Sequence, residues 1–158
     1  MLDARQRLRL GAQREEGLAL EIEQVLFADQ RRPGERDDFR AAIDVAAARY
    51  PGLPVWAAGY SFGAWIAADV GAVDPRVRQL IAIAPPVTSY DFEAVIAAGK
   101  PVFLIQGERD HLAPVKSVQR FYGTLTEPRE LVIVDGADHL FDGHVSEVAD
   151  TIADLLSE

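Results

Sequence analysis

The chain has 158 residues, no cysteine and a formal net charge of −9. The lack of cysteine excludes disulfides, thiolate nucleophiles and thiolate metal sites, and the negative charge argues against a nucleic-acid partner, whose phosphates favour Lys and Arg. No apolar run is long enough to cross a bilayer and the N-terminus has no apolar secretion signal, so we expect a cytoplasmic protein without a membrane partner.

The charge is unevenly distributed along the sequence. Residues 1–32 hold six arginines against six acidic side chains, whereas the remaining chain holds ten basic against nineteen acidic side chains. Arg31–Gly34 has the composition of a linker, with two arginines followed by Pro and Gly. We therefore predict two parts: an atypical N-terminal segment over residues 1–33, and an α/β core over residues 34–158.

Helix and strand patterns alternate from Gly34 onward. The strands are apolar without alternation, which is typical of a parallel sheet covered by helices on both faces, so we predict an α/β fold. Pro51-Gly52 and Pro85-Pro86 end a helix and a strand, because proline lacks the N–H that either element needs. The predicted elements are helices over Glu35–Tyr50, Phe62–Val70, Asp91–Ala98, Pro114–Tyr122 and His144–Leu156, and strands over Leu53–Ala58, Val77–Ala84, Pro101–Gln106 and Glu130–Val134.

The last predicted helix has a distinct apolar face. A period of 3.6 residues places its five apolar side chains on the same side of the helix. The five residues are Val145, Val148, Ile152, Leu155 and Leu156.

A Gly-x-Ser-x-Gly motif lies between the first predicted strand and the second predicted helix. In Gly59–Gly63 the serine is Ser61, and the flanking glycines permit the sharp turn that lifts its hydroxyl above the sheet. The following helix directs its N-terminus at the serine and favours negative charge there. This context favours a nucleophile, and the alternative interpretation is a glycine-rich turn without chemistry.

Two further residue types complete the chemistry that a serine nucleophile needs. Asp110 follows the strand at Pro101–Gln106, and His139 follows the last strand. Parallel sheets build their sites at the carboxyl ends of strands, so Ser61, Asp110 and His139 are expected to meet there. A serine requires a base oriented by an acid, which makes His139 the predicted base and Asp110 the predicted acid. Glu108 is the alternative acid.

The other polar residues near these loops have simpler interpretations. We expect His111 to flank the site and His144 to be a surface or capping residue at the start of the last helix. Asp138 and Asp142 bracket the histidine loop, where they either tune the imidazole or are solvated. No group of His and carboxylate side chains has the spacing of a metal site, so no metal is expected.

These residues resemble the α/β-hydrolase superfamily, and in particular small bacterial serine hydrolases without a large lid. The resemblance runs from about Gly34 to the C-terminus and rests on the motifs Gly59–Gly63, Ile83–Pro86, Gln106–Glu108 and Gly136–Phe141. It implies a three-layer αβα fold with a parallel sheet. It also implies cleavage of a small-molecule carboxylic ester, thioester or amide through an acyl-enzyme, with no cofactor.

The resemblance assigns the nucleophile to Ser61, the acid to Asp110, the base to His139 and an oxyanion-hole donor to the backbone N–H of Phe62. Before Gly34, however, the chain lacks the strands of such hydrolases and the loop that supplies their second oxyanion donor. We therefore expect an N-terminus that is truncated or frame-shifted, and an exposed edge on the strand Leu53–Ala58. The alternative function is a catalytically impaired binding or partner-dependent module, which forms homo-oligomers through that edge.

Overall fold

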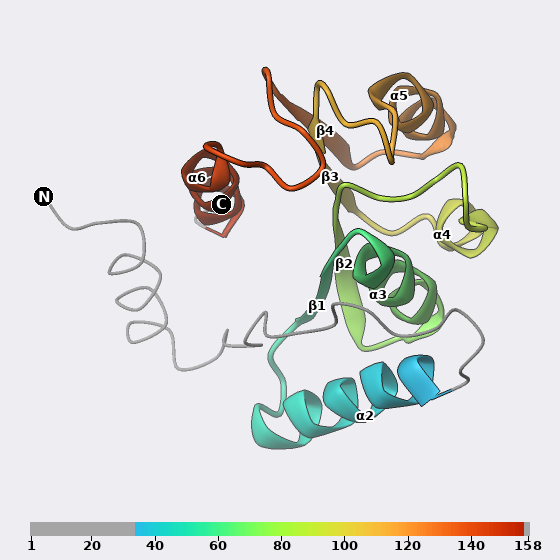
Figure 1. Cartoon of the computed structure of the whole chain (residues 1–158). Coiled ribbons are helices and arrows are strands. Elements are labelled where there is room, and N and C mark those ends of the chain that lie inside the picture. Colours follow the sequence, from blue (N-terminus) through green and yellow to red (C-terminus); the bar gives the residue numbers. More distant parts are fainter. Residues whose placement is uncertain (1–33, 157–158) are drawn as a thin grey trace, which may run out of the picture.

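The computed structural model describes residues 34–156, and its centre is a parallel four-stranded sheet (Figure 1). The strands follow one another across the sheet in the order β1-β2-β3-β4. Parallel neighbours must be joined by crossovers, and helices supply them. The strands are β1 (Val55–Tyr60), β2 (Val77–Ile83), β3 (Val102–Gly107) and β4 (Arg129–Val134). The helices are α2 (Gly34–Arg49), α3 (Phe62–Val73), α4 (Glu93–Ala98), α5 (Val115–Thr124) and α6 (Val145–Leu155).

Helices cover both faces of the sheet, so the expected αβα layers are confirmed. Helices α3, α4 and α5 lie on one side of the strands and α6 lies on the other (Figure 1). Successive side chains of a strand point to opposite faces, and the two hydrophobic clusters follow this rule. Leu80 and Leu104 pack with the α3 side, together with Ile43 of α2, whereas Ile81 and Ile105 pack with the α6 side.

The predicted elements agree with the observed ones to within three residues. The largest difference is at the end of α3, which extends to Val73 because its last turn is still packed on the sheet through the buried Ala72. Helix α4 begins two residues later than predicted, at Glu93, whose N–H donates to the carboxylate of Asp91 at 2.7 Å in the turn before the helix.

The apolar face of α6 is buried only in its middle. Val148 is buried, and Ile152 and Leu155 pack against the same cluster. Val145 and Leu156, at the two ends, are 65% and 37% exposed. The apolar face of α6 therefore contacts the sheet through Val148, Ile152 and Leu155, and is exposed at Val145 and Leu156.

The N-terminal predictions lie outside the described residues. They are the atypical segment over 1–33, the missing strands and oxyanion loop, and the truncated or frame-shifted start. Within residues 34–156, β2 is the sole strand paired with β1. The division of the chain near residue 33 stays a prediction.

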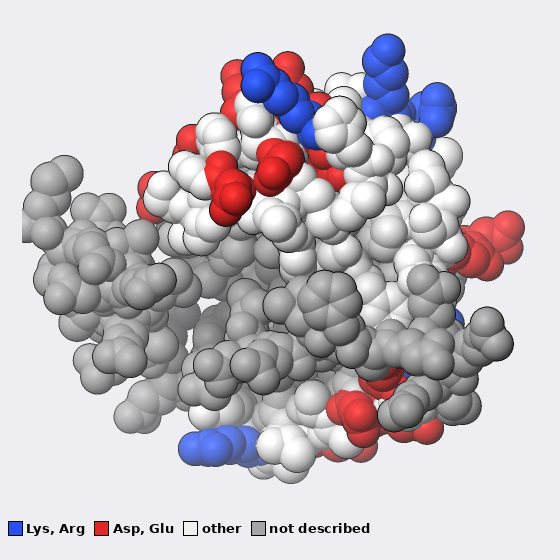
Figure 2. Space-filling view, in the orientation of Figure 1, with Lys and Arg blue, Asp and Glu red and all other residues white. Residues whose placement is uncertain are grey.

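On the face in Figure 2, acidic side chains gather mainly in the upper part and at the lower edge, and a few Lys and Arg side chains lie at the top and bottom. Within the described part, none of the helices is long and apolar enough to cross a membrane.

Candidate active site

Ser61 occupies a strained turn between β1 and α3. Its φ of 52° and ψ of −122° are unfavourable for a residue with a side chain, and such strain persists where the surroundings enforce it. One constraint is the hydrogen bond from the Ser61 N–H to the carbonyl of Ile83 in β2, at 2.8 Å. Another is Gly59, where a Cβ would lie 2.1 Å from the carbonyl oxygen of Gly63. The turn therefore requires glycine at position 59, as the motif predicts.

Asp110 lies buried in the loop after β3, and its carboxylate is fully engaged. Oδ1 accepts hydrogen bonds from the N–H groups of Leu112 and Ala113, at 2.8 and 2.7 Å. Oδ2 accepts one from Nε2 of Gln106 at 2.9 Å, and it lies 2.7 Å from Nδ1 of His139. An ionised carboxylate is an acceptor only, so four surrounding donors suit it and fix its orientation.

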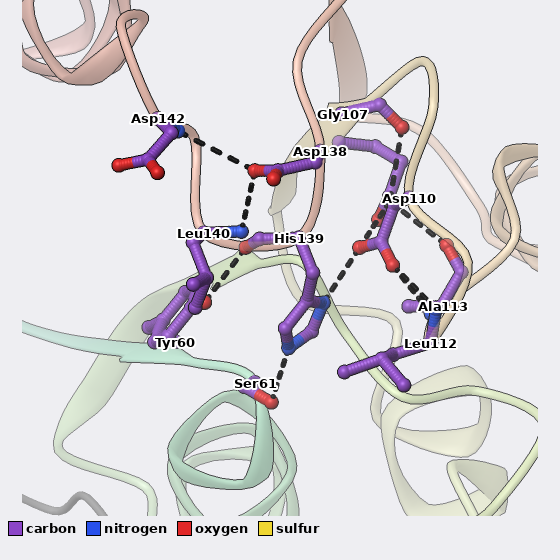
Figure 3. A network of polar contacts seen from close by, with 11 residues as sticks. Tyr60, Ser61, Gly107, Asp110, Leu112, Ala113, Asp138, His139, Leu140 and Asp142 are labelled. Carbon is purple, nitrogen blue, oxygen red and sulfur yellow. Dashed lines mark hydrogen bonds and ion pairs between the residues drawn. The ribbon is translucent and has the colours of Figure 1, made fainter.

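His139 joins the other two predicted residues. Its Nδ1 faces Asp110, and its Nε2 lies 2.9 Å from Oγ of Ser61 (Figure 3). With the proton on Nδ1, the imidazole donates to the carboxylate, and Nε2 is left to accept the serine proton. The structure thus brings Ser61, His139 and Asp110 together from the ends of β1, β4 and β3.

The acid and base loops are held against each other by one hydrogen bond between their main chains and one to the Glu108 side chain. The N–H of Arg109 donates to the carbonyl of Ala137 at 2.9 Å. The N–H of Gly136 donates to Oε2 of Glu108 at 2.8 Å. Glu108, the alternative acid, therefore bonds the backbone of the histidine loop, while Asp110 bonds the imidazole. A Cβ at Gly107 would lie 2.6 Å from the carbonyl oxygen of Asp138, so the loops approach too closely for a side chain there.

Two residues with contacts to this site were not singled out from the sequence. Tyr60 donates its hydroxyl hydrogen to the carbonyl of His139 at 2.7 Å, and burial, followed by the nearby charges of Asp110 and Asp138, raises the pKa of its phenol. Gln106 holds Asp110. The available signal for Gln106 was a polar residue at the end of an otherwise apolar strand. Tyr60 stands inside the motif itself, but nothing in its sequence neighbourhood indicates its distant partner.

The backbone at Phe62 suits the expected oxyanion donor. Phe62 is the first residue of α3, and the first N–H groups of a helix have no acceptor within the helix. The positive end of the helix dipole lies at the same place. The Phe62 side chain belongs to an aromatic cluster with Trp65 and Tyr90, with ring centroids 5.7 and 5.6 Å from its own.

The remaining predicted residues lie around the site or away from it. Asp138 accepts hydrogen bonds from the N–H groups of Leu140 and Asp142, at 3.0 and 3.4 Å, and so shapes the histidine loop. His111 is exposed. His144 immediately precedes α6 and contacts the carboxylate of Glu147 at 3.0 Å, without a side-chain cap on the backbone. Residues 34–156 contain no cluster of His, Cys, Asp or Glu suited to a metal ion.

Comparison with known proteins identifies related sequences. Residues 22–156 match the sequence family described as an alpha/beta hydrolase domain. An uncharacterized protein of Rickettsia prowazekii is 32% identical over 106 residues, covering 62% of this chain and 44% of that protein.

Two solved structures show the same fold. An alpha-beta serine hydrolase homologue from Coxiella burnetii is 31% identical with a TM-score of 0.73, covering 86% of this chain and 65% of that chain. A serine hydrolase without a lid from Xanthomonas campestris is 28% identical with a TM-score of 0.69, covering 82% of this chain and 59% of that one. The chain therefore spans less than two thirds of the length of these relatives.

Proposed function

This chain belongs to the alpha/beta hydrolase domain family, and we propose that it is a serine hydrolase that cleaves a small-molecule carboxylic ester, thioester or amide through an acyl-enzyme. The observation that carries the proposal is the continuous hydrogen-bonded row from Ser61 through His139 to Asp110, with distances of 2.9 and 2.7 Å. An isolated serine hydroxyl is a weak nucleophile, and this row supplies the base and the orienting acid that activate it.

The proposed reaction has two halves. Ser61 Oγ attacks the substrate carbonyl while His139 Nε2 accepts the hydroxyl proton, and the negative charge develops on the former carbonyl oxygen. Collapse of this intermediate breaks the bond to the leaving group, which takes the proton from His139. A water molecule then attacks the acyl-serine by the same route and releases the carboxylic acid and free Ser61.

Asp110 and Phe62 have supporting roles in this mechanism. Asp110 holds Nδ1 of His139 and stabilises the imidazolium that forms when Nε2 is protonated. The N–H of Phe62, at the start of α3, is the proposed donor to the oxyanion. One such donor contributes about 3 to 4 kcal/mol to stabilising the transition state in comparable enzymes.

The test is covalent labelling with a fluorophosphonate probe, followed by the intact mass of the protein. We expect the parent protein and the control Ser146→Ala, an exposed serine in α6, to gain one probe each, and Ser61→Ala to gain none. Circular dichroism establishes that each protein is folded. A folded parent that gains no probe would overturn the proposal.

A second candidate is the partner-dependent module without catalysis. It is favoured by β1, which pairs within the described residues with β2 alone. Backbone groups on the outer edge of such a strand are available to another chain. The labelling experiment separates the two functions, because a module that does not catalyse has no need of an activated serine.

A further inference from the structure

The loop that carries His139 has to cross most of the sheet. Strand β4, which precedes the loop, and strand β1, which ends at the nucleophile, are the outer strands of the order β1-β2-β3-β4. With neighbouring strands about 4.8 Å apart, the two lie roughly 14 Å from each other. The hydrogen bond between Ser61 and His139 therefore depends on what holds the far end of this loop near β1.

The end of the loop near β3 is well fixed. Ala137 accepts the N–H of Arg109, and Gly136 donates to Glu108, so this part is bound to the acid loop by two hydrogen bonds. These contacts position the residues before His139. They do not involve the carbonyl group of His139, and the residues just after it bond within the loop itself, to the Asp138 carboxylate.

Tyr60 provides the contacts on the β1 side. Its hydroxyl donates to the carbonyl oxygen of His139 at 2.7 Å (Figure 3). Its ring lies against the imidazole, with centroids 5.4 Å apart, and against the buried Phe141, with centroids 6.5 Å apart. Tyr60 immediately precedes Ser61. The residue that contacts His139 and the proposed nucleophile are therefore neighbours in the same turn.

From this geometry we propose that Tyr60 is a positioning residue: its hydroxyl holds the main chain of His139 at the distance from Ser61 that proton transfer requires. The inference rests on the proposed serine hydrolase function and adds a residue to it. His139 is then fixed at its carbonyl by Tyr60, at Nδ1 by Asp110 and at Nε2 by Ser61. The raised pKa of Tyr60 keeps its hydroxyl protonated, and therefore a donor, throughout the neutral range.

The substitution Tyr60→Phe separates the hydroxyl from the ring. It keeps the packing on His139 and Phe141 and removes only the donor. We expect kcat for a small probe ester such as p-nitrophenyl acetate, and the rate of fluorophosphonate labelling, to fall about 3- to 10-fold, the effect of one neutral hydrogen bond. We expect KM to stay within about twofold, because Tyr60 does not contact substrate in this proposal. Tyr122→Phe, in α5 and away from the site, is the matched control.

A spectroscopic readout tests the same geometry without turnover. The proton shared by Nδ1 of His139 and Asp110 gives a downfield imidazole signal in the NMR spectrum, assigned by its loss in His139→Gln. We expect this signal to broaden in Tyr60→Phe and to be unchanged in Tyr122→Phe. A Tyr60→Phe protein with the labelling rate and the imidazole signal of the parent would overturn the inference. A parent that is not labelled would instead contradict the hydrolase proposal, and the NMR comparison would still decide the role of Tyr60.

Discussion

Gln106 is completely buried at the end of an apolar strand, where a polar side chain is costly unless its groups are paired. Its Nε2 donates to Oδ2 of Asp110 at 2.9 Å and to the carbonyl of Ala113 at 2.8 Å. Its Oε1 has no hydrogen-bond partner among the described residues. The Gln106 amide therefore holds Asp110 through its Nε2, while its Oε1 has no partner among the described residues.

The contacts of Gln106 can be tested with the substitution Gln106→Leu. This substitution removes one donor from Asp110 and leaves the carbonyl of Ala113 buried without its partner. We expect a loss of about 1 to 3 kcal/mol in the free energy of unfolding, measured in urea, and slower fluorophosphonate labelling. Gln119→Leu, at an exposed position of α5, should change neither. An unaltered labelling rate in Gln106→Leu would mean that the backbone donors alone orient Asp110.

The contribution of Asp74 to the stability of the fold is expected to depend on pH. Hydrogen bonds from the Arg76 side chain lower the pKa of Asp74, and the contact distances are 2.6 and 3.0 Å. Because the pKa of the folded state is the lower one, the contribution to stability is complete above about pH 4, the ordinary carboxyl value, and disappears as the pH falls through the folded value.

We therefore expect Asp74→Asn to lower the urea midpoint slightly at pH 7 and to have less effect at pH 3. The loss is small because the pair is near the surface. The exposed Asp135→Asn is the control and should leave the urea midpoint unchanged at pH 7. Equal losses at the two pH values would show that the carboxylate charge is not the cause.

At the scale of elements, the contact between the acid loop and the histidine loop depends on Gly107. In Gly107→Ala the new methyl group would overlap the carbonyl oxygens of Ala137 and Asp138, at 2.7 and 2.6 Å, and both belong to the backbone. The loops must separate, and Asp110 must move from His139. We expect a lower melting temperature and a loss of labelling of tenfold or more, because misplacement of catalytic groups by about 1 Å costs on the order of 100-fold.

The matched control for this prediction is Gly123→Ala in α5. A Cβ there meets no atom within 4 Å, and alanine favours a helix over glycine. We expect the control to be as stable as the parent or slightly more stable. Normal labelling of Gly107→Ala would show that the two loops can shift without disturbing the catalytic groups.

The elements were largely predictable from the sequence, because each is defined by local signals. Proline and glycine mark the ends of helices and strands, and continuous apolar runs mark buried parallel strands. The meeting of Ser61, Asp110 and His139 followed from their places after three strands of one parallel sheet.

The role of Tyr60 was not predictable, since its partner is 79 residues away and is a backbone carbonyl, which every residue possesses. Gln106 donates to a residue four positions on, but only the folded loop turns Asp110 back toward it.

For the whole molecule, the outer edge of β1 leads to a prediction about assembly. Within the described residues its backbone groups on that side face no strand, and an unpaired edge favours association with another chain. We expect a molecular mass that rises with protein concentration in light scattering. A constant monomer mass over the accessible range would contradict both the homo-oligomer and the need for a partner strand.

The long sequence separation between Ser61 and His139 also has a consequence for how the protein is synthesised. The hydrogen bond between Ser61 and His139 joins residues 78 apart, and every strand after β1 lies between them. At roughly 5 to 20 residues per second, a ribosome needs about 4 to 16 s to synthesise this interval. Throughout that time the nascent chain presents a serine without a base, and an isolated serine hydroxyl is a weak nucleophile. Under the proposed serine hydrolase function, Ser61 therefore becomes reactive only when the last strand has docked and His139 lies beside it.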